Sequence, residues 1–120
     1  MIAAFINKLD LPDFNHGYGN GYVAVSMNEL KLSHLAKLVY DNSCTVEVHG
    51  GITFHDFGKV CAEYFSNIEW IDDEVDLVKY FVFGFDTCHY NDTLETWPRE
   101  KVIEETLHLK EQIYEFLYGN

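Results

Sequence analysis

The chain has 120 residues, 48% of them hydrophobic and 16% aromatic, which is enough for a single domain, residues 1–120, with a core of its own. Its formal net charge of −12 is concentrated in residues 61–120, which hold 14 acids and 4 bases, and such a charge disfavours direct binding to nucleic acid. The three cysteines have no CxxC spacing, which argues against a disulfide framework and against a zinc knuckle.

The start of the chain predicts no membrane segment. Its apolar stretch, Met1–Ile6, is too short for a signal peptide or a membrane span. Residues 1–13 predict an extended or irregular lead-in, and the three glycines of Asn15–Tyr22 predict a loop. This loop lacks the GxGxxG and GK[ST] patterns of phosphate-binding loops. The β-branched run Tyr22–Ser26 then predicts a strand.

The middle of the chain alternates predicted helices and strands. Apolar residues at helical spacing predict a helix within Asn28–Tyr40, with Ser33 as a possible N-cap. Cys44–His49 predicts a strand that turns at Gly50-Gly51 and continues through Ile52–Phe54. One or two helical turns follow between residues 57 and 65. The acidic stretch 69–76 predicts an exposed loop, pinned to the body by the hydrophobic residues at 70 and 71.

The last third of the chain carries the two clearest signals. Tyr80–Phe85 has no charge and four aromatic residues, which is typical of a strand buried on both faces. Residues 102–117 repeat apolar positions at three and four, and predict an amphipathic helix whose inner face includes Leu107 and Tyr114. Pro98 suits the first turn of this helix, with Thr96 as a possible cap. The predicted fold is α+β: a small antiparallel or mixed sheet with the C-terminal helix packed on it.

Polar side chains follow directly after the buried strand. Asp86, His89 and Asp92 are spaced by three, so one helical turn or a tight loop would place them on one side. A carboxylate beside an imidazole orients its tautomer and makes it a usable base. Two carboxylates with one or two histidines can also hold a divalent ion such as Zn, Mn or Fe. The structural alternative is that Asp86 caps a turn and that His89 bonds only to Asp86.

A second segment is a candidate for the same site. His49 precedes Gly50-Gly51, where missing side chains would let a ligand approach the backbone closely. Alternatively, the two glycines only turn a hairpin. The candidate ligand-binding residues are His49, Gly50, Gly51, Asp86, His89 and Asp92; the candidate metal ligands are His49, Asp86, His89 and Asp92; and the candidate catalytic residues are His49, Asp86 and His89.

These motifs resemble a family of small proteins encoded by tailed phages and prophages. Its members carry a Gly-Tyr-rich start, then His-Gly-Gly-[Leu/Ile]-Thr-[Phe/Tyr], then Gly-Phe-Asp-x-x-His-x-x-Asp, and end in a helix. The matching segments are Gly17–Val23, His49–Phe54, Phe83–Asp92 and the helix Val102–Ile113. The family has a tandem Trp before the Gly-Phe-Asp motif, where this chain has Val82 and Phe83. The resemblance implies a phage or prophage accessory protein in the bacterial host cytoplasm, and it carries no established activity.

The predicted function is therefore a binding protein for an unknown small ligand or a divalent metal, held between the His-Gly-Gly turn and the Gly-Phe-Asp segment. If the protein is an enzyme, a metal-assisted hydrolase is the first expectation. The alternative is an acidic interaction protein that inhibits a host nucleic-acid-handling or defence complex, as a DNA mimic does. A homodimer through an aromatic-rich face is compatible with either function.

Overall fold

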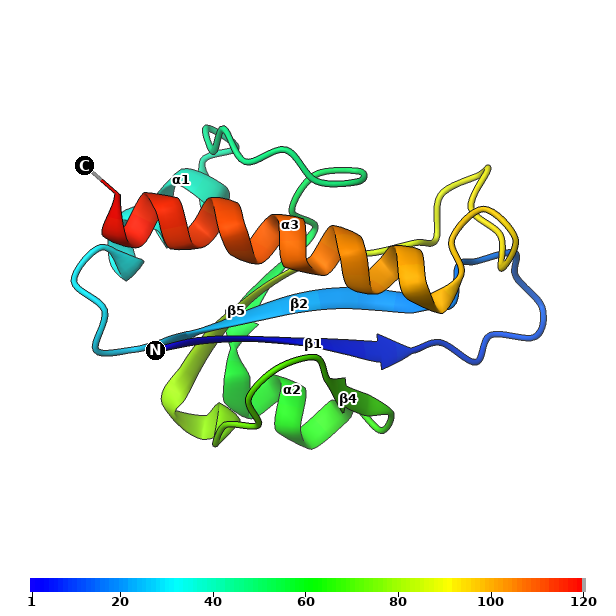
Figure 1. Cartoon of the computed structure of the whole chain (residues 1–120), viewed down its shortest axis with the longest axis horizontal. Helices are drawn as coiled ribbons and strands as arrows, with labels where there is room; N and C mark the ends of the chain where they lie inside the picture. Colours follow the sequence, from blue (N-terminus) through cyan, green and yellow to red (C-terminus); the bar gives the residue numbers. More distant parts are fainter. Residues whose placement is uncertain (120) are drawn as a thin grey trace.

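The protein is built on one antiparallel sheet covered by helices on both faces (Figure 1). The computed structural model describes residues 1–119. The strand order in the five-stranded sheet is β3-β5-β2-β1-β4, and each neighbouring pair is antiparallel. The α+β class is thus confirmed. In chain order the elements are β1 (Ile2–Lys8), β2 (Gly19–Ser26), α1 (Leu32–Tyr40), β3 (Phe54–Phe57), α2 (Gly58–Tyr64), β4 (Ile68–Trp70), the 3-10 turn η1 (Leu77–Lys79), β5 (Tyr80–Phe85) and α3 (Arg99–Tyr118).

The strand β5 lies inside the sheet, between β3 and β2, and both of its faces are covered. Phe83 and Phe85 point into the cluster under α1 and α3, whereas Val82 belongs to the cluster on the α2 side. All three side chains are at most 1% exposed. The prediction of a strand buried on both faces from an uncharged aromatic run is therefore confirmed.

The sequence predicts an extended or irregular lead-in over residues 1–13, and the structure resolves this choice, because Ile2–Lys8 form the strand β1. Residues 3–6 are completely buried, and β1 pairs with β2 on one side and β4 on the other. Ile6 packs under α3, and Phe5 packs on the opposite face against Tyr22 and Trp70. Because both faces of β1 are buried over residues 2–6, this part is uniformly apolar and lacks the alternation by which a half-exposed strand is recognised.

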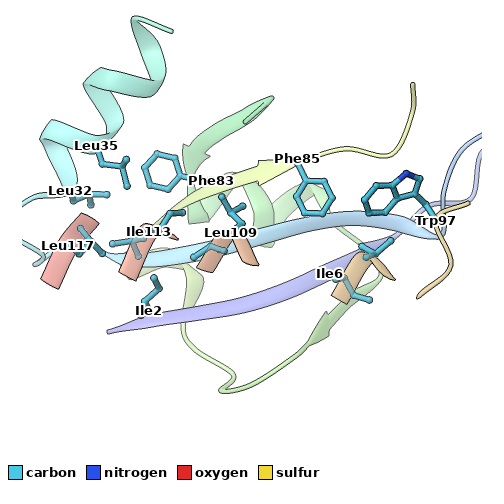
Figure 2. Close-up of a cluster of buried hydrophobic side chains, with 13 residues drawn as sticks. Ile2, Ile6, Leu32, Leu35, Phe83, Phe85, Trp97, Leu109, Ile113 and Leu117 are labelled. Atoms are coloured by element: carbon cyan, nitrogen blue, oxygen red, sulfur yellow. The ribbon is translucent and has the colours of Figure 1, made fainter. Parts of the chain in front are cut away.

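The long helix α3 crosses one face of the sheet (Figure 1). It supplies most of the helical contribution to the core, including Leu109, Ile113 and Leu117 (Figure 2). The prediction that Leu107 and Tyr114 lie on the inner face of α3 is wrong. Their side chains are 41% and 53% exposed, and Leu109 is buried instead. Thr106 hydrogen-bonds its hydroxyl to the Val102 carbonyl, which lets this polar residue lie against the sheet. The buried face of α3 consists of Val102, Thr106, Leu109, Ile113 and Leu117.

Both predicted side-chain caps are wrong. Ser33 lies inside α1, whose N-cap residue is Lys31, and no side chain caps that helix. Thr96 bonds to the backbone N–H of Thr93, within the turn before α3, and Pro98 occupies the N-cap position of α3. A proline has no backbone N–H, so α3 begins with one fewer donor to satisfy.

The predicted strand Cys44–His49 is also wrong: this segment is extended but belongs to no strand of the sheet. It runs along α3, where the side chain of Gln112 makes the two backbone hydrogen bonds that a neighbouring strand would otherwise make. Its Oε1 accepts from Glu47 N at 2.8 Å, and its Nε2 donates to Glu47 O at 2.7 Å. The alternation of Val46 and Val48 is real, because both pack against the core, but the alternation does not reveal whether the partner is a strand or a helix.

We expect Gln112→Ala to destabilise the fold by about 1–2 kcal/mol, since both bonds to Glu47 are lost and two backbone groups need new partners. Amide hydrogen exchange at Glu47 should rise, and urea unfolding should give the change in free energy. Glu111→Ala is the matched control, because Glu111 is exposed on the same helix and makes no such bonds. Equal effects of the two substitutions would contradict this role of Gln112.

The acidic stretch 69–76 is only in part the predicted exposed loop, because Glu69 and Trp70 belong to β4, which pairs with β1. The predicted anchoring at residues 70 and 71 is confirmed. Trp70 packs on Phe5 with ring centroids 5.0 Å apart, and Ile71 N donates to Ala4 O at 2.9 Å. Two acids of this stretch are paired inside the molecule: Glu69 with Arg99, and Asp72 with Lys110. Burial raises the pKa of Asp72, but hydrogen bonds from Ala4 N and Lys110 outweigh it and leave that pKa below its usual value.

Candidate functional site

Three side chains from two distant segments meet at one end of the sheet. His49 comes from the turn at the end of the segment along α3, and His89 and Asp92 come from the loop after β5. Among residues 1–119, these form the only group of three or more His, Cys, Asp or Glu that could hold a metal ion. One ligand atom from each lies within 4.8 Å of the others. Of the residues predicted for the site, these three are brought into direct contact.

Asp92 is the centre of the cluster and is only 3% exposed. Its carboxylate lies 2.9 and 3.0 Å from His49 Nε2 and 2.7 Å from His89 Nδ1, and it also accepts from the backbone N–H of His89 at 2.9 Å. Since an ionised carboxylate only accepts, both imidazoles donate from these nitrogens. Burial raises the pKa of Asp92, but the hydrogen bonds from His49 and His89 outweigh it and hold that pKa below its usual value.

His49 is fixed by its surroundings on several sides. The centroid of its ring lies 4.2 Å from the centroid of the Trp97 ring, with 33° between the two ring planes, and 4.8 Å from the centroid of the His89 ring. Its backbone N–H donates to Glu105 Oε2 of α3 at 3.0 Å. Lys101 Nζ lies 4.4 Å from the centre of the Trp97 ring, which is a cation–π contact.

The two glycines after His49 have different roles. Both have positive φ, +70° at Gly50 and +80° at Gly51, and they form the turn in which Gly51 N donates to Val48 O. A Cβ on Gly50 would overlap the imidazole of His89, whereas a Cβ on Gly51 would meet nothing within 4 Å. The turn itself was predicted; the close approach to His89 explains why the first glycine has no side chain.

Asp86 lies on the other side of His89 and is not part of the three-residue cluster. Its Oδ2 accepts from Thr53 Oγ1 at 2.9 Å, and its Oδ1 accepts from Cys88 N at 3.0 Å. Its Oδ1 is 3.7 Å from His89 Nε2, which is beyond hydrogen-bonding distance. The imidazole of His89 therefore has one carboxylate in contact at Nδ1 and a second one close to Nε2.

The neighbouring thiol is not activated. Burial raises the pKa of Cys88, and the negative charges of Asp86 and Asp92 raise it further. A thiol with a raised pKa is largely protonated at neutral pH and is a poor nucleophile. The chemistry of the site is therefore that of imidazoles and carboxylates.

Sequence reasoning missed Trp97, Glu105 and Thr53. Trp97 stands in the connection before α3, where no periodic pattern separates a core aromatic residue from a loop residue. Glu105 lies on α3 between apolar positions of the repeat, and its type alone gives no sign of a contact with another segment. Thr53 belongs to the His49–Phe54 motif. In that motif, only Gly50-Gly51 indicates that the turn approaches another segment, and nothing indicates a contact of Thr53 with Asp86.

Comparison with known proteins adds no family and no relative. Within the part of the chain that the structure describes, no helix is both long and apolar enough to cross a membrane. No family model, no curated protein and no solved structure matches this chain.

Proposed function

We propose that the protein binds a divalent transition-metal ion, with zinc as the first candidate, at His49, His89 and Asp92. The observation that carries the proposal is the convergence of one carboxylate and two imidazoles on one point, from segments that are 43 residues apart in sequence. Imidazole with carboxylate is a donor set suited to zinc, manganese and iron.

The ligand atoms, which lie within 4.8 Å of one another, must rearrange when an ion binds. In a tetrahedral zinc site with bonds of about 2.0–2.1 Å, ligand atoms lie about 3.3 Å apart. The carboxylate of Asp92 is already 2.7 Å from His89 Nδ1 and 2.9 Å from His49 Nε2. To admit the ion, both nitrogens must lose their protons, and each imidazole then carries its proton on the other nitrogen.

This change of tautomer gives Asp86 a role. When His89 binds through Nδ1, its N–H is at Nε2, which faces Asp86 Oδ1 at 3.7 Å. A carboxylate that accepts the second N–H of a metal-bound histidine orients the ring and raises its basicity. Thr53 and Cys88 N hold Asp86 in place for this contact.

Three protein ligands leave a fourth position of a tetrahedral ion for water. The site is open enough for it, because the side chains of His49 and His89 are 25% and 38% exposed. An open position on a three-ligand zinc ion is the arrangement of zinc hydrolases, in which the ion lowers the pKa of the bound water. Metal-assisted hydrolysis is accordingly the reaction class that we propose for this site.

The alternative function, an acidic inhibitor of a host nucleic-acid-handling or defence complex, has weaker support. The sequence feature that most supports this alternative is the acidic stretch 69–76. Glu69 and Asp72 are paired with Arg99 and Lys110, and Asp76 accepts from Val78 N, so these acids are partly used within the fold. A surface that mimics a phosphate backbone needs free carboxylates.

The test is zinc binding by competition with a chromophoric chelator, together with elemental analysis of protein purified without chelator. We expect about one zinc per chain. His89→Gln should weaken zinc binding by about 100-fold or more because a direct ligand is lost, and Asp86→Asn should weaken it by about 10–100-fold through orientation alone. His55→Gln is the control, since His55 is exposed and outside the cluster. Unchanged affinity in folded His89→Gln protein would refute the metal site.

A further inference from the structure

Helices α1 and α3 lie on the same face of the sheet (Figure 1). Residues from α1, from the segment that follows it and from the C-terminal half of α3 line a groove on this face. Its volume of about 1120 Å³ lies slightly above the usual range for small-molecule sites, roughly 300–1,000 Å³. No residue of the His49, His89 and Asp92 cluster lines this groove. The groove is therefore separate from the proposed metal site.

The floor of the groove is apolar and partly exposed. Leu38 from α1, Cys44 and Val46 from the following segment, and Phe116 from α3 line it, and the last three also pack against the main core. One wall is held firmly, because Gln112 bonds to both backbone groups of Glu47. A ligand would thus meet an apolar surface that is formed in advance, which lowers the entropy cost of binding.

The rim on the α3 side is acidic. Glu111 and Glu115 both line the groove, are exposed, and stand four residues apart on one face of the helix. Like charges at this spacing repel each other. Within residues 1–119, neither carboxylate belongs to an ion pair. A cation placed between them would relieve the repulsion.

The other charged groups of the lining do not cancel this acidity. Lys31 is the one lysine or arginine among the lining residues, against two glutamates. With histidines neutral, the groove carries a net negative charge, on a chain whose net charge is −12. His34, whose ring lies 5.5 Å from that of Phe116, and His108 complete the polar rim. The potential favours a cationic ligand over a carboxylate.

We propose that this groove binds an amphipathic amine. The hydrocarbon part lies on Leu38, Val46 and Phe116, and the ammonium group lies between the carboxylates of Glu111 and Glu115. An ammonium group has three donors for these acceptors, and a hydrocarbon chain removes the apolar floor from water. This site is independent of the proposed metal site.

The probe is n-octylammonium, titrated into ¹⁵N-labelled full-length protein, with n-octanoate and n-octanol as ligands of the same chain length. We expect saturable binding with shifts centred on the groove residues, and octylammonium bound at least about tenfold more tightly than octanoate. Shortening the chain from eight to four carbons should weaken binding by roughly fourfold per methylene.

The matched variants compare two glutamate pairs on one helix. Glu111→Gln/Glu115→Gln should weaken octylammonium binding by about tenfold and leave octanol binding unchanged. Glu100→Gln/Glu104→Gln removes an exposed pair with the same spacing outside the groove, and should have little effect. Equal loss in both double variants, octanoate binding as tight as octylammonium, or shifts centred elsewhere would overturn the proposal.

Discussion

Gly50→Ala should weaken zinc binding by about 10–100-fold, whereas Gly51→Ala should leave zinc affinity nearly unchanged. A Cβ at Gly50 would overlap the His89 imidazole, which must swing away to make room. That movement breaks the 2.7 Å contact between His89 Nδ1 and the Asp92 carboxylate. The substitution therefore acts on the site through geometry, without removing any ligand.

The pair of glycines controls for backbone strain. Both residues have positive φ, so alanine costs roughly 1–2 kcal/mol of folding free energy at either position. Only in the Gly50 variant does the added Cβ also overlap another side chain, the imidazole of His89. We expect similar losses in urea unfolding for the two variants, with a change in the ring ¹⁵N shifts of His89 confined to Gly50→Ala. Equal zinc affinity in both variants would show that the approach of Gly50 to His89 does not position the ring.

The parts of the fold that could be predicted are those with a strong local pattern. The uncharged aromatic run of β5 and the repeat along α3 each indicate an element without knowledge of the partner. The undecided prediction at β1, extended or irregular, and the wrong strand prediction at Cys44–His49 share one cause. In both, the outcome depends on what lies beside the segment: strands on both sides of β1, and the Gln112 side chain of α3 in the second case.

The same distinction applies to the candidate site. The pairing of His89 with Asp92 follows from a local spacing of three residues, and it was predictable as one side of a turn. The contact of His49 with Asp92 joins residues 43 apart and depends on how the segment after α1 runs along α3. No local pattern encodes that path, nor the stacking of Trp97 on His49.

Asp92→Asn should destabilise the protein by about 2–4 kcal/mol at neutral pH. Asp92 is buried and accepts from two imidazoles and one backbone N–H. An asparagine has only one acceptor oxygen, so its NH₂ group would face a donor. It also removes the negative charge that the two imidazoles share. Urea unfolding at pH 7 measures the change, with Asp73→Asn as the control at an exposed acid.

The pH dependence of this effect has a definite sign. The pKa of Asp92 is lowered in the folded protein from its ordinary value of 3.8. The unfolded state then binds the proton first as pH falls, so the stabilisation from Asp92 is fully present above that value and is lost as pH falls below it, through the lowered pKa. The difference in stability between the unsubstituted protein and Asp92→Asn should therefore shrink as pH falls below about 4.

The control separates this effect from general acid unfolding. A chain with 20 acids loses stability in acid for many reasons, and Asp73→Asn shares all of them except the buried contacts. We expect its difference from the unsubstituted protein to stay small at every pH. A gap for Asp92→Asn that persists unchanged below pH 4 would mean that the cost arises from packing of the amide. A gap that closes would assign it to the ionised carboxylate between the two imidazoles, the form of the site that a divalent ion requires.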